Sequence, residues 1–332
     1  MRYIIIGAGA IGATIGARLF ETGHEVVLAA RGAHYAAMRD GGLRFGTPDG
    51  TVTLPVPAVA GPGELALRRD DALILAVKTQ DSAAALDAWA GQPAGGGEVA
   101  AQAVPVFCAQ NGVASERIAL RRFRRVYGVS VWLPAVHLEP GSVTAGGTPM
   151  TGLLPVGRYP AGADDTAGQV AADLAASRFL SPVRPDVMRL KYGKLLTNLS
   201  NAVQAVFGTE SRPDDVAARL RRRARAEGSA VLAAAGIDCA GPEELAALRG
   251  DQVEVAAGPA TGTGGSSWQS LRRGTGSIEA DYLNGEIVLL GRLHGVPTPV
   301  NELLQRLANQ FARDRRAPGS ITDREVADLP AA

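Results

Sequence analysis

Three lysines stand out among the residues that could carry proton chemistry. Of the 34 basic residues only Lys78, Lys191 and Lys194 are lysines, and all the others are arginines. An arginine guanidinium keeps its proton at every accessible pH, whereas burial and neighbouring charges can tune a lysine ammonium to release one. The composition therefore makes each lysine a candidate proton donor, with chance retention as an equal alternative.

Two of these lysines share a predicted helix with two asparagines. At about 100° per residue, four polar positions fall within roughly 80° of one another on a segment otherwise rich in leucine and valine. They are Lys191, Lys194, Asn198 and Asn201. Asparagine is a poor helix former, and the chain has only six. The stripe therefore favours a ligand site over a water-facing surface, and Lys194 and Asn198, one turn apart, could share a ligand.

The N-terminus carries a motif typical of dinucleotide binding. A buried strand, Tyr3–Ile6, runs into a glycine loop and then into an amphipathic helix that ends near Gly23. In such loops the first glycine permits the turn, the second lets the backbone approach a pyrophosphate, and the third lets the helix pack on the strand. A second strand, residues 25–30, follows at βαβ spacing. We therefore expect cofactor contacts from Gly7, Ala8, Gly9, Ala10, Ile11 and Gly12.

The end of the second strand predicts which dinucleotide binds. An acidic side chain there would accept the ribose 2′-hydroxyl of NAD, but this strand runs into Arg31. A guanidinium can pair with a 2′-phosphate, so the sequence indicates NADP(H) as the cofactor. The alternative is a solvated loop arginine.

Polar residues also follow two later strands, which are predicted at residues 72–77 and 104–107. Lys78 comes directly after the first strand, and Asn111 follows the second closely. Open α/β sheets bind ligands at the carboxyl ends of their strands, so both side chains should line the cofactor crevice. For Asn111 and Gly112 the alternative is an ordinary turn.

The strand pattern stops at a proline-rich boundary, Ser181–Pro185, after an irregular stretch over residues 134–160 and a helix over residues 167–176. We predict an α/β protein with three parts: an N-terminal doubly wound Rossmann sheet over residues 1–182, an all-helical domain over 183–316, and a flexible tail over 317–332. The helices of the second domain are predicted at residues 186–207, 214–235, 242–256, 278–294 and 299–313.

Several separated motifs resemble those of the ketopantoate reductase family (2-dehydropantoate 2-reductases), and the resemblance covers nearly the whole chain. They are Gly7-Ala8-Gly9-Ala10-Ile11-Gly12, Val77-Lys78-Thr79-Gln80, Gln110-Asn111-Gly112, Lys194-Leu195-Leu196-Thr197-Asn198, and Ser266-Ser267 twelve residues ahead of Ile278-Glu279-Ala280-Asp281-Tyr282-Leu283-Asn284-Gly285. The resemblance implies a Rossmann domain followed by a helical domain similar to the C-terminal domain of 6-phosphogluconate dehydrogenase. It also implies reduction of a 2-oxo acid by NADPH, with 2-dehydropantoate converted to pantoate.

The resemblance assigns roles to individual residues. Lys194 would be the general acid and Glu279 its carboxylate partner. Lys78 would lie near the nicotinamide. Residues that would hold the substrate are Asn111, Asn198 and Ser267, with Asn201 as a further candidate. Taken by itself, Glu279 in the first turn of a helix would also favour the helix dipole, whatever the function.

The chain departs from the family pattern at three positions that concern substrate contacts. A second asparagine is expected eight residues beyond the catalytic lysine, where this chain has Ala202, with Asn201 one place earlier. A polar residue expected shortly before the serine pair falls at Gly264, and a small aliphatic residue or methionine expected after the pair is Trp268. The alternatives to ketopantoate reduction are another ketone or an imine as substrate, or an NADPH-binding sensor without turnover.

Composition limits the other classes of function. With 34 basic and 33 acidic residues the net charge is +1, which argues against nucleic-acid or anionic-membrane partners. No apolar run approaches the roughly 18 residues of a transmembrane helix, and we expect a soluble cytoplasmic protein, monomeric or homodimeric. The two cysteines, Cys108 and Cys239, lie far apart in apolar surroundings, so we expect buried thiols and no metal site.

Overall fold

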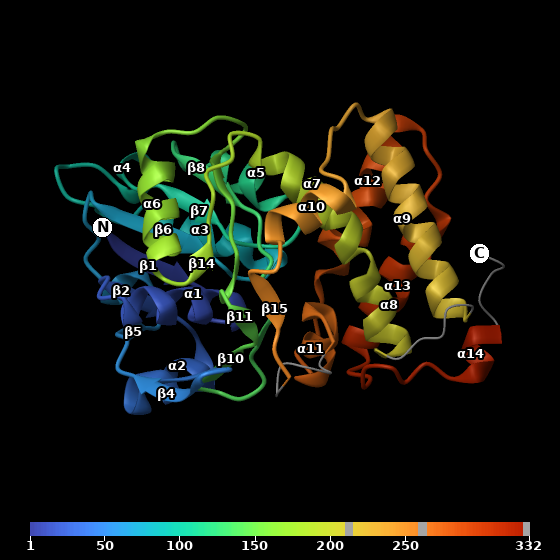
Figure 1. Cartoon of the computed structure of the whole chain (residues 1–332), viewed down its shortest axis with the longest axis horizontal. Helices are drawn as coiled ribbons and strands as arrows, with labels where there is room; N and C mark the ends of the chain where they lie inside the picture. Colours follow the sequence, from blue (N-terminus) through green and yellow to red (C-terminus); the bar gives the residue numbers. More distant parts are fainter. Residues whose placement is uncertain (210–214, 258–263, 328–332) are drawn as a thin grey trace. The chain divides into compact units, whose positions relative to one another are not determined.

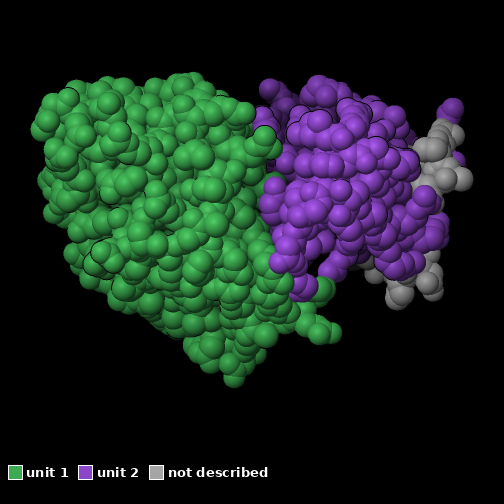
Figure 2. All heavy atoms as spheres, turned by 90° about the horizontal axis from the view of Figure 1, so that it is seen from above, with its two compact units in different colours: residues 1–191, 242–261 green, residues 192–241, 262–332 purple. Residues whose placement is uncertain are grey.

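The computed structural model describes residues 1–209, 215–257 and 264–327. The chain divides into two compact units, coloured separately in Figure 2, and each is described by itself. Unit 1 comprises residues 1–191 and 242–261, and unit 2 comprises residues 192–241 and 262–332.

Unit 1 is built on a seven-stranded sheet, which contains the predicted strands (Figure 1). Its order is β13-β8-β7-β6-β1-β2-β5, and all neighbouring strands are parallel except the edge pair β13 and β8. Because β1 lies between β2 and β6, the strand order reverses there, which is where open α/β sheets bind ligands. The strands are β1 (Arg2–Ile6), β2 (Val26–Ala29), β5 (Ala58–Val59), β6 (Asp71–Leu75), β7 (Val106–Cys108), β8 (Val126–Val129) and β13 (Val156–Arg158).

Helices cover both faces of this sheet, as the continuous apolar runs of its strands require. In β1, Tyr3 and Ile5 belong to one buried cluster, together with side chains of α1 (Ala10–Glu21) and α6 (Asp165–Ala176). Ile4 and Ile6 belong to the other cluster, together with side chains of α3 (Ser82–Ala90), α4 (Ala100–Ala103) and α5 (Ser115–Leu120). The predicted doubly wound Rossmann arrangement is therefore confirmed.

Several short elements of unit 1 were not predicted. A four-stranded sheet, in the order β4-β3-β10-β9, forms from segments that lie between the main strands in sequence. The stretch over residues 134–160, which was expected to be irregular, contributes five strands. They were not predicted because each is only two to four residues long and lacks a readable alternation. The added elements are α2 (Gly32–Gly41), β3 (Leu43–Thr47), β4 (Gly50–Leu54), β9 (Ala135–Val136), β10 (Ser142–Ala145), β11 (Gly147–Pro149), β12 (Gly152–Leu153) and β14 (Phe179–Leu180), with the 3₁₀ turns η1 (Pro62–Glu64) and η2 (Thr79–Asp81).

The regular elements in the described residues of unit 2 are all helices. Helix α8 packs against α9, α11 and α13, and α12 packs against α9 and α13. The single helix predicted over residues 186–207 is divided into two at Leu199, although Leu199 keeps helical backbone angles (φ −57°, ψ −25°) and its N–H donates to the Leu195 carbonyl at 3.1 Å. The elements are α8 (Ser200–Phe207), α9 (Val216–Ala234), α11 (Ser266–Arg272), η3 (Glu279–Tyr282), α12 (Asn284–His294), α13 (Pro299–Arg313) and α14 (Asp323–Ala327), and α7 (Val187–Asn198) begins in unit 1 and ends in unit 2.

The division of the chain differs from the predicted boundary at residue 182. Unit 1 continues to Lys191, and it also takes back residues 242–261, which contain α10 (Pro242–Arg249) and β15 (Val253–Val255). The reason is pairing: β15 forms an antiparallel ladder with β11, so residues 253–255 are a strand where a helix was predicted.

The tail also differs from the prediction. Residues 317–327 were expected to be frayed, but the Gly319 N–H donates to the carbonyl of Ala205, and the Arg316 guanidinium pairs with Glu325 of α14. The two hydrogen bonds between Arg316 and Glu325 are charge-assisted, so they can order this segment although its composition is small and polar. Residues 328–332 lie outside the described part.

Membrane-spanning helices and metal-binding clusters are both absent from the described residues. None of their helices is long and apolar enough to cross a membrane. They contain no group of three or more His, Cys, Asp or Glu side chains that could hold a metal ion.

Candidate active site

The glycine loop after β1 has the geometry that a pyrophosphate site needs. Gly7 has a φ of +99°, and a Cβ there would lie 2.7 Å from the Val77 backbone nitrogen. A Cβ on Gly12 would lie 2.2 Å from the carbonyl oxygen of Gly7. A Cβ on Gly9, by contrast, would meet nothing within 4 Å. Gly7 is thus required by its positive φ and by the close approach of Val77, and Gly12 by the packing of the helix on the loop and strand. Gly9 leaves open space above the loop, as the approach of a dinucleotide backbone requires.

The helix that follows the loop leaves its N-terminus available to an anion. Gly9 is the N-cap of α1, no side chain caps the helix, and its first turn carries no acidic residue. The first N–H groups of a helix have no partner within the helix, and its dipole favours negative charge there. The loop and the helix therefore fit the pyrophosphate of a dinucleotide.

Arg31 is the residue for which a contact with a 2′-phosphate was predicted. It is exposed, directly follows the end of the second strand, and is the N-cap of α2 with extended backbone angles. Among the described residues no carboxylate pairs with Arg31, which leaves its guanidinium available to a phosphate.

His34 contacts the glycine loop in a way that the sequence did not reveal. Its Nδ1 accepts a hydrogen bond of 2.8 Å from the Gly141 N–H, and its Nε2–H donates to the carbonyl of Ala8 at 2.6 Å. Because Nδ1 is an acceptor, the ring is in the neutral Nε2–H tautomer. His34 thereby ties α2 to the glycine loop, a contact between segments that only the fold brings together.

The loops that carry Lys78 and Asn111 are joined to each other. The side-chain amide of Gln110 is buried and donates to the Val77 carbonyl at 2.7 Å and to the Ser82 hydroxyl at 2.8 Å. These bonds connect the residue before Lys78 with the residue before Asn111. Both predicted residues are half-buried at the carboxyl ends of β6 and β7. The following Gly112 has a φ of +76°, as the turn at this position requires.

Lys191 does not belong to the polar stripe in the way the helical pattern predicted. It is 2% exposed, its Nζ forms an ion pair with Glu116, and it donates to the carbonyls of Gln110 at 2.9 Å and Cys108 at 3.4 Å. All of these partners are in unit 1. Lys191 is therefore engaged with the end of β7, and Lys194 is the remaining lysine of α7.

Cys108 has no sign of reactivity. Burial raises the pKa of its thiol, and the nearby Glu116 carboxylate raises the pKa further. The thiolate is the reactive form, so this cysteine is an inert core residue, as expected. Cys239, which was also expected to be buried, is only partly buried.

Unit 2 presents a polar group that lacks a partner. Asn198 is 4% exposed, and its Nδ2 has no hydrogen-bond partner among the described residues. An unmet buried donor of this kind is costly unless a ligand or water satisfies it. Lys194 lies four residues earlier on α7 and is half-buried. The same face of the helix thus offers an ammonium and an amide donor.

The serine segment adds hydroxyl groups to unit 2. Ser267 is 2% exposed in the first turn of α11, and the buried Oγ of Ser266 has no partner among the described residues. Glu279 is also buried and is the first residue of η3. These residues and Lys194 all belong to unit 2, while the cofactor residues belong to unit 1.

Two of the three departures from the family pattern, Gly264 and Trp268, are in contact in the structure. A Cβ on Gly264 would lie 2.4 Å from Cγ of Trp268, so the indole occupies the space where a side chain at 264 would stand. The two departures are therefore a single change. Ala202 is buried at 2% exposure. Asn201, in contrast, has its Oδ1 3.0 Å from the position of a Cβ on Gly265, next to the serine segment.

A buried amide network contacts Leu199, the residue between α7 and α8. The Nδ2 of Asn284 donates to the Leu199 carbonyl at 3.3 Å and to Oδ1 of Asn301 at 3.0 Å. Asn301 in turn donates to the carbonyl of Ala224 and to Glu227. Asn284 belongs to the motif after Glu279, and its role in positioning α7 against α8 was not evident from the sequence.

Comparisons with known proteins agree with this organisation. The family model for ketopantoate reductase PanE/ApbA matches residues 3–157, and the model for its C-terminal part matches residues 186–312. A 2-dehydropantoate 2-reductase of Mycobacterium tuberculosis is 30% identical over 310 residues, which cover 90% of this chain and 94% of that protein.

Solved structures share the fold over almost the whole chain. A PanE/ApbA family ketopantoate reductase from Ralstonia eutropha JMP134 is 26% identical, with a TM-score of 0.76, covering 95% of this chain and 100% of that one. D-mandelate dehydrogenase, in a ternary structure with NADH and anilino(oxo)acetate, is 22% identical with a TM-score of 0.78, covering 96% of this chain and 100% of that one.

Proposed function

The chain belongs to the ketopantoate reductase family, and from that premise we propose that it is an NADPH-dependent reductase that transfers a hydride to the C2 carbonyl of a 2-oxo acid. The first substrate to test is 2-dehydropantoate, which would give pantoate. The observation that carries the proposal is the unmet amide donor of Asn198, one helical turn from Lys194, in a chain that both family models match.

The cofactor is a nicotinamide dinucleotide, which when bound supplies the hydride. Residues 7–12 and the N-terminus of α1 would hold its pyrophosphate, and Lys78 and Asn111 would lie toward the nicotinamide end. We assign NADP(H) over NAD(H) because Arg31 is exposed, has no carboxylate partner among the described residues, and follows β2 where an acidic residue would select NAD.

In unit 2, Lys194 acts as the general acid. Hydride addition to a ketone carbon builds negative charge on the carbonyl oxygen, and an ammonium within hydrogen-bond reach both stabilises that charge and protonates the oxygen. Glu279, as a buried carboxylate, orients the ammonium. The unmet amide of Asn198 and the hydroxyl of Ser267 donate to the substrate, with Asn111 and Asn201 as further contacts.

A second substrate is favoured by one specific observation. Trp268 fills the space above Gly264, so this chain has an indole where the family pattern has a polar side chain. Because a changed pocket alters which side chain of a 2-oxo acid can be accommodated, a different 2-oxo acid or ketone is the alternative.

Steady-state oxidation of NADPH with 2-dehydropantoate, beside a panel of other 2-oxo acids and ketones, tests the proposal, with NADH as the control cofactor. We expect saturable turnover with at least one 2-oxo acid. Rate enhancement by added ammonia or amines would indicate imine reduction. Tight NADPH binding without turnover on the whole panel would contradict the enzyme proposal and indicate a sensor.

A further inference from the structure

A buried ion pair joins α7 to the end of the sheet in unit 1. The ammonium of Lys191 is 2% exposed and pairs with the carboxylate of Glu116 in α5, which is completely buried. Removing two charges from water is costly, and a buried pair is therefore weak evidence for a gain in stability. Moreover, the second oxygen of Glu116, Oε2, has no hydrogen-bond partner among the described residues. An incompletely satisfied pair of this kind suggests a use other than stability.

The remaining hydrogen bonds of the ammonium show what it fixes. Lys191 donates to the carbonyl of Gln110 at 2.9 Å and to that of Cys108 at 3.4 Å. Cys108 is the last residue of β7, and Gln110 directly precedes Asn111. The ammonium therefore holds the backbone at the point where the chain leaves the sheet and reaches Asn111.

The side chain of Gln110 extends this constraint to the neighbouring loop. Its amide donates to the carbonyl of Val77 and to the hydroxyl of Ser82, on either side of the turn that contains Lys78. Three elements that are far apart in sequence, namely α7, the loop after β7 and the loop after β6, are thus connected by hydrogen bonds through two buried side chains.

We propose that Lys191 and Gln110 are positioning residues that hold the loops of Lys78 and Asn111 in the conformation that receives the nicotinamide cofactor and the substrate. The roles of Lys78 and Asn111 rest on the proposed function. Lys191 itself touches neither cofactor nor substrate; it acts through the Gln110 carbonyl. The chemistry it supplies is that of a buried, fixed donor.

Three variants separate positioning from stability. Lys191→Met keeps most of the length of the side chain, one atom shorter, and removes the ammonium. The double variant Lys191→Met with Glu116→Met also removes the carboxylate that would otherwise be left unpaired, and apolar replacement of a buried pair often restores stability. Gln110→Met removes only the amide that reaches Val77 and Ser82. Each variant is measured for its melting temperature, its Kd for NADPH by fluorescence titration, and its kcat/KM.

We expect Lys191→Met to lower the melting temperature and to raise the Kd for NADPH. It should also reduce kcat/KM by between about ten- and a hundredfold, as small misplacements of reacting groups do. The double variant should regain most of the melting temperature while kcat/KM stays low and the Kd for NADPH stays raised. Gln110→Met should reproduce the loss of activity. If the double variant recovers binding and activity together with its melting temperature, the ion pair serves stability alone and the proposal is overturned.

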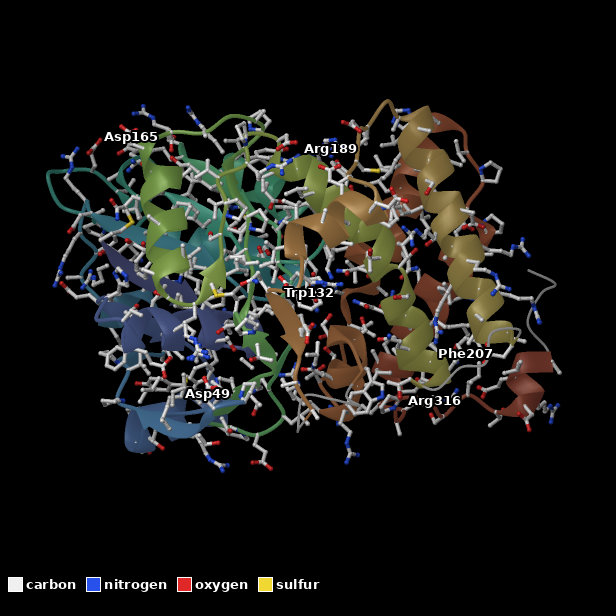
Figure 3. The ribbon with its side chains drawn as sticks, in the orientation of Figure 1. Asp49, Trp132, Asp165, Arg189, Phe207 and Arg316 are labelled. Carbon is white, nitrogen blue, oxygen red and sulfur yellow. The ribbon has the colours of Figure 1, made fainter. Side chains whose placement is uncertain are left out.

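A matched control lies on the same helix. Arg189, labelled in Figure 3, pairs with Glu244 at 2.6 Å, with both side chains about one-third exposed. Arg189→Met with Glu244→Met removes this partly exposed ion pair and the 3.6 Å contact of Glu244 with Arg184, and should leave Kd and kcat/KM within about twofold of the wild type.

Failure of the proposed function is distinguishable from failure of this inference. A wild-type protein that reduces no 2-oxo acid contradicts the proposed function. In that case the positioning role is judged from the Kd for NADPH alone, and an unchanged Kd in both Lys191→Met and Gln110→Met overturns it.

Discussion

At the scale of single residues, Lys191 and Lys194 are three positions apart on α7 and yet have different surroundings. Composition made both candidates for proton chemistry, and helical spacing placed both on one stripe. The fold separates them, because Lys191 is engaged by Glu116 and two backbone carbonyls in unit 1, while Lys194 belongs to unit 2. A periodicity argument gives the direction of a side chain around its own helix and cannot say which neighbour packs there.

Replacing Lys194 tests the general acid directly. We expect Lys194→Met to lower kcat by a factor between about a hundred and ten thousand, the usual contribution of general acid catalysis. Lys194→Arg should also stay slow, since a guanidinium retains charge but does not release its proton. The Kd for NADPH, measured by fluorescence titration, should remain near that of the wild type in both variants, in contrast to Lys191→Met. Turnover of Lys194→Met within about threefold of wild type would exclude Lys194 as the acid.

At the scale of secondary structure, the break between α7 and α8 places Asn198 and Asn201 on separate helices. Leu199 alone separates them, and its carbonyl accepts from the fully buried amide of Asn284. The sequence offered no proline or glycine at this break, so it predicted one continuous helix. Leu199 itself keeps helical backbone angles, and the boundary coincides with a tertiary hydrogen bond from a residue 85 positions later, which local propensity does not report.

Asn284→Ala tests this arrangement. The change would leave the Leu199 carbonyl and the Asn301 side chain without their donor in a buried site, at a cost of about 1–3 kcal/mol for each unsatisfied group. We expect a lower free energy of unfolding by denaturant, together with a fall in kcat from misplacement of Asn198. Asn309→Ala is the matched control, because Asn309 donates its amide to Asp281 at the surface. Equal effects of the two substitutions would argue against a special role for Asn284.

The difference between local sequence pattern and tertiary contacts also explains which strands were predicted. The central strands β1, β2, β6 and β7 are continuous apolar runs, and the pattern located each of them to within two residues. The short strands β9 to β13 are held by their partners and not by their own composition. Strand β11, for example, pairs with β15, which comes from a stretch that was predicted as the end of a helix. Pairing across long sequence separations is not visible in a window of local pattern.

At the scale of the whole molecule, the chain forms two compact units, and the first takes back residues 242–261. The two family models together describe the order of the halves, but neither shows this return. Sequence reasoning predicted the fold class, which the structure confirms, and the cofactor loop, which stays a prediction, because both depend on local glycine and strand patterns. It missed the return, the His34 tie and the Lys191 ion pair, because each depends on contacts between distant segments.

The glycine loop and Arg31 both belong to unit 1. The rise in melting temperature on cofactor binding should therefore report whether the protein prefers NADPH or NADH. A ligand that binds only the folded state at a hundred times its Kd adds about 2.7 kcal/mol to the free energy of unfolding. For a domain of this size that corresponds to a rise in melting temperature of roughly 5–11 °C. At equal concentration, NADPH should raise the melting temperature more than NADH does.

The variant Arg31→Ala should remove most of that difference. Loss of a hydrogen bond to a charged phosphate costs about 1.5–3 kcal/mol, which corresponds to a rise in the Kd for NADPH of about tenfold or more and leaves the Kd for NADH almost unchanged. Arg44→Ala, at an exposed arginine of the same unit, is the control and should preserve the preference. Equal stabilisation of the wild type by NADPH and NADH would contradict the assignment of NADP(H), while leaving the dinucleotide loop itself in place.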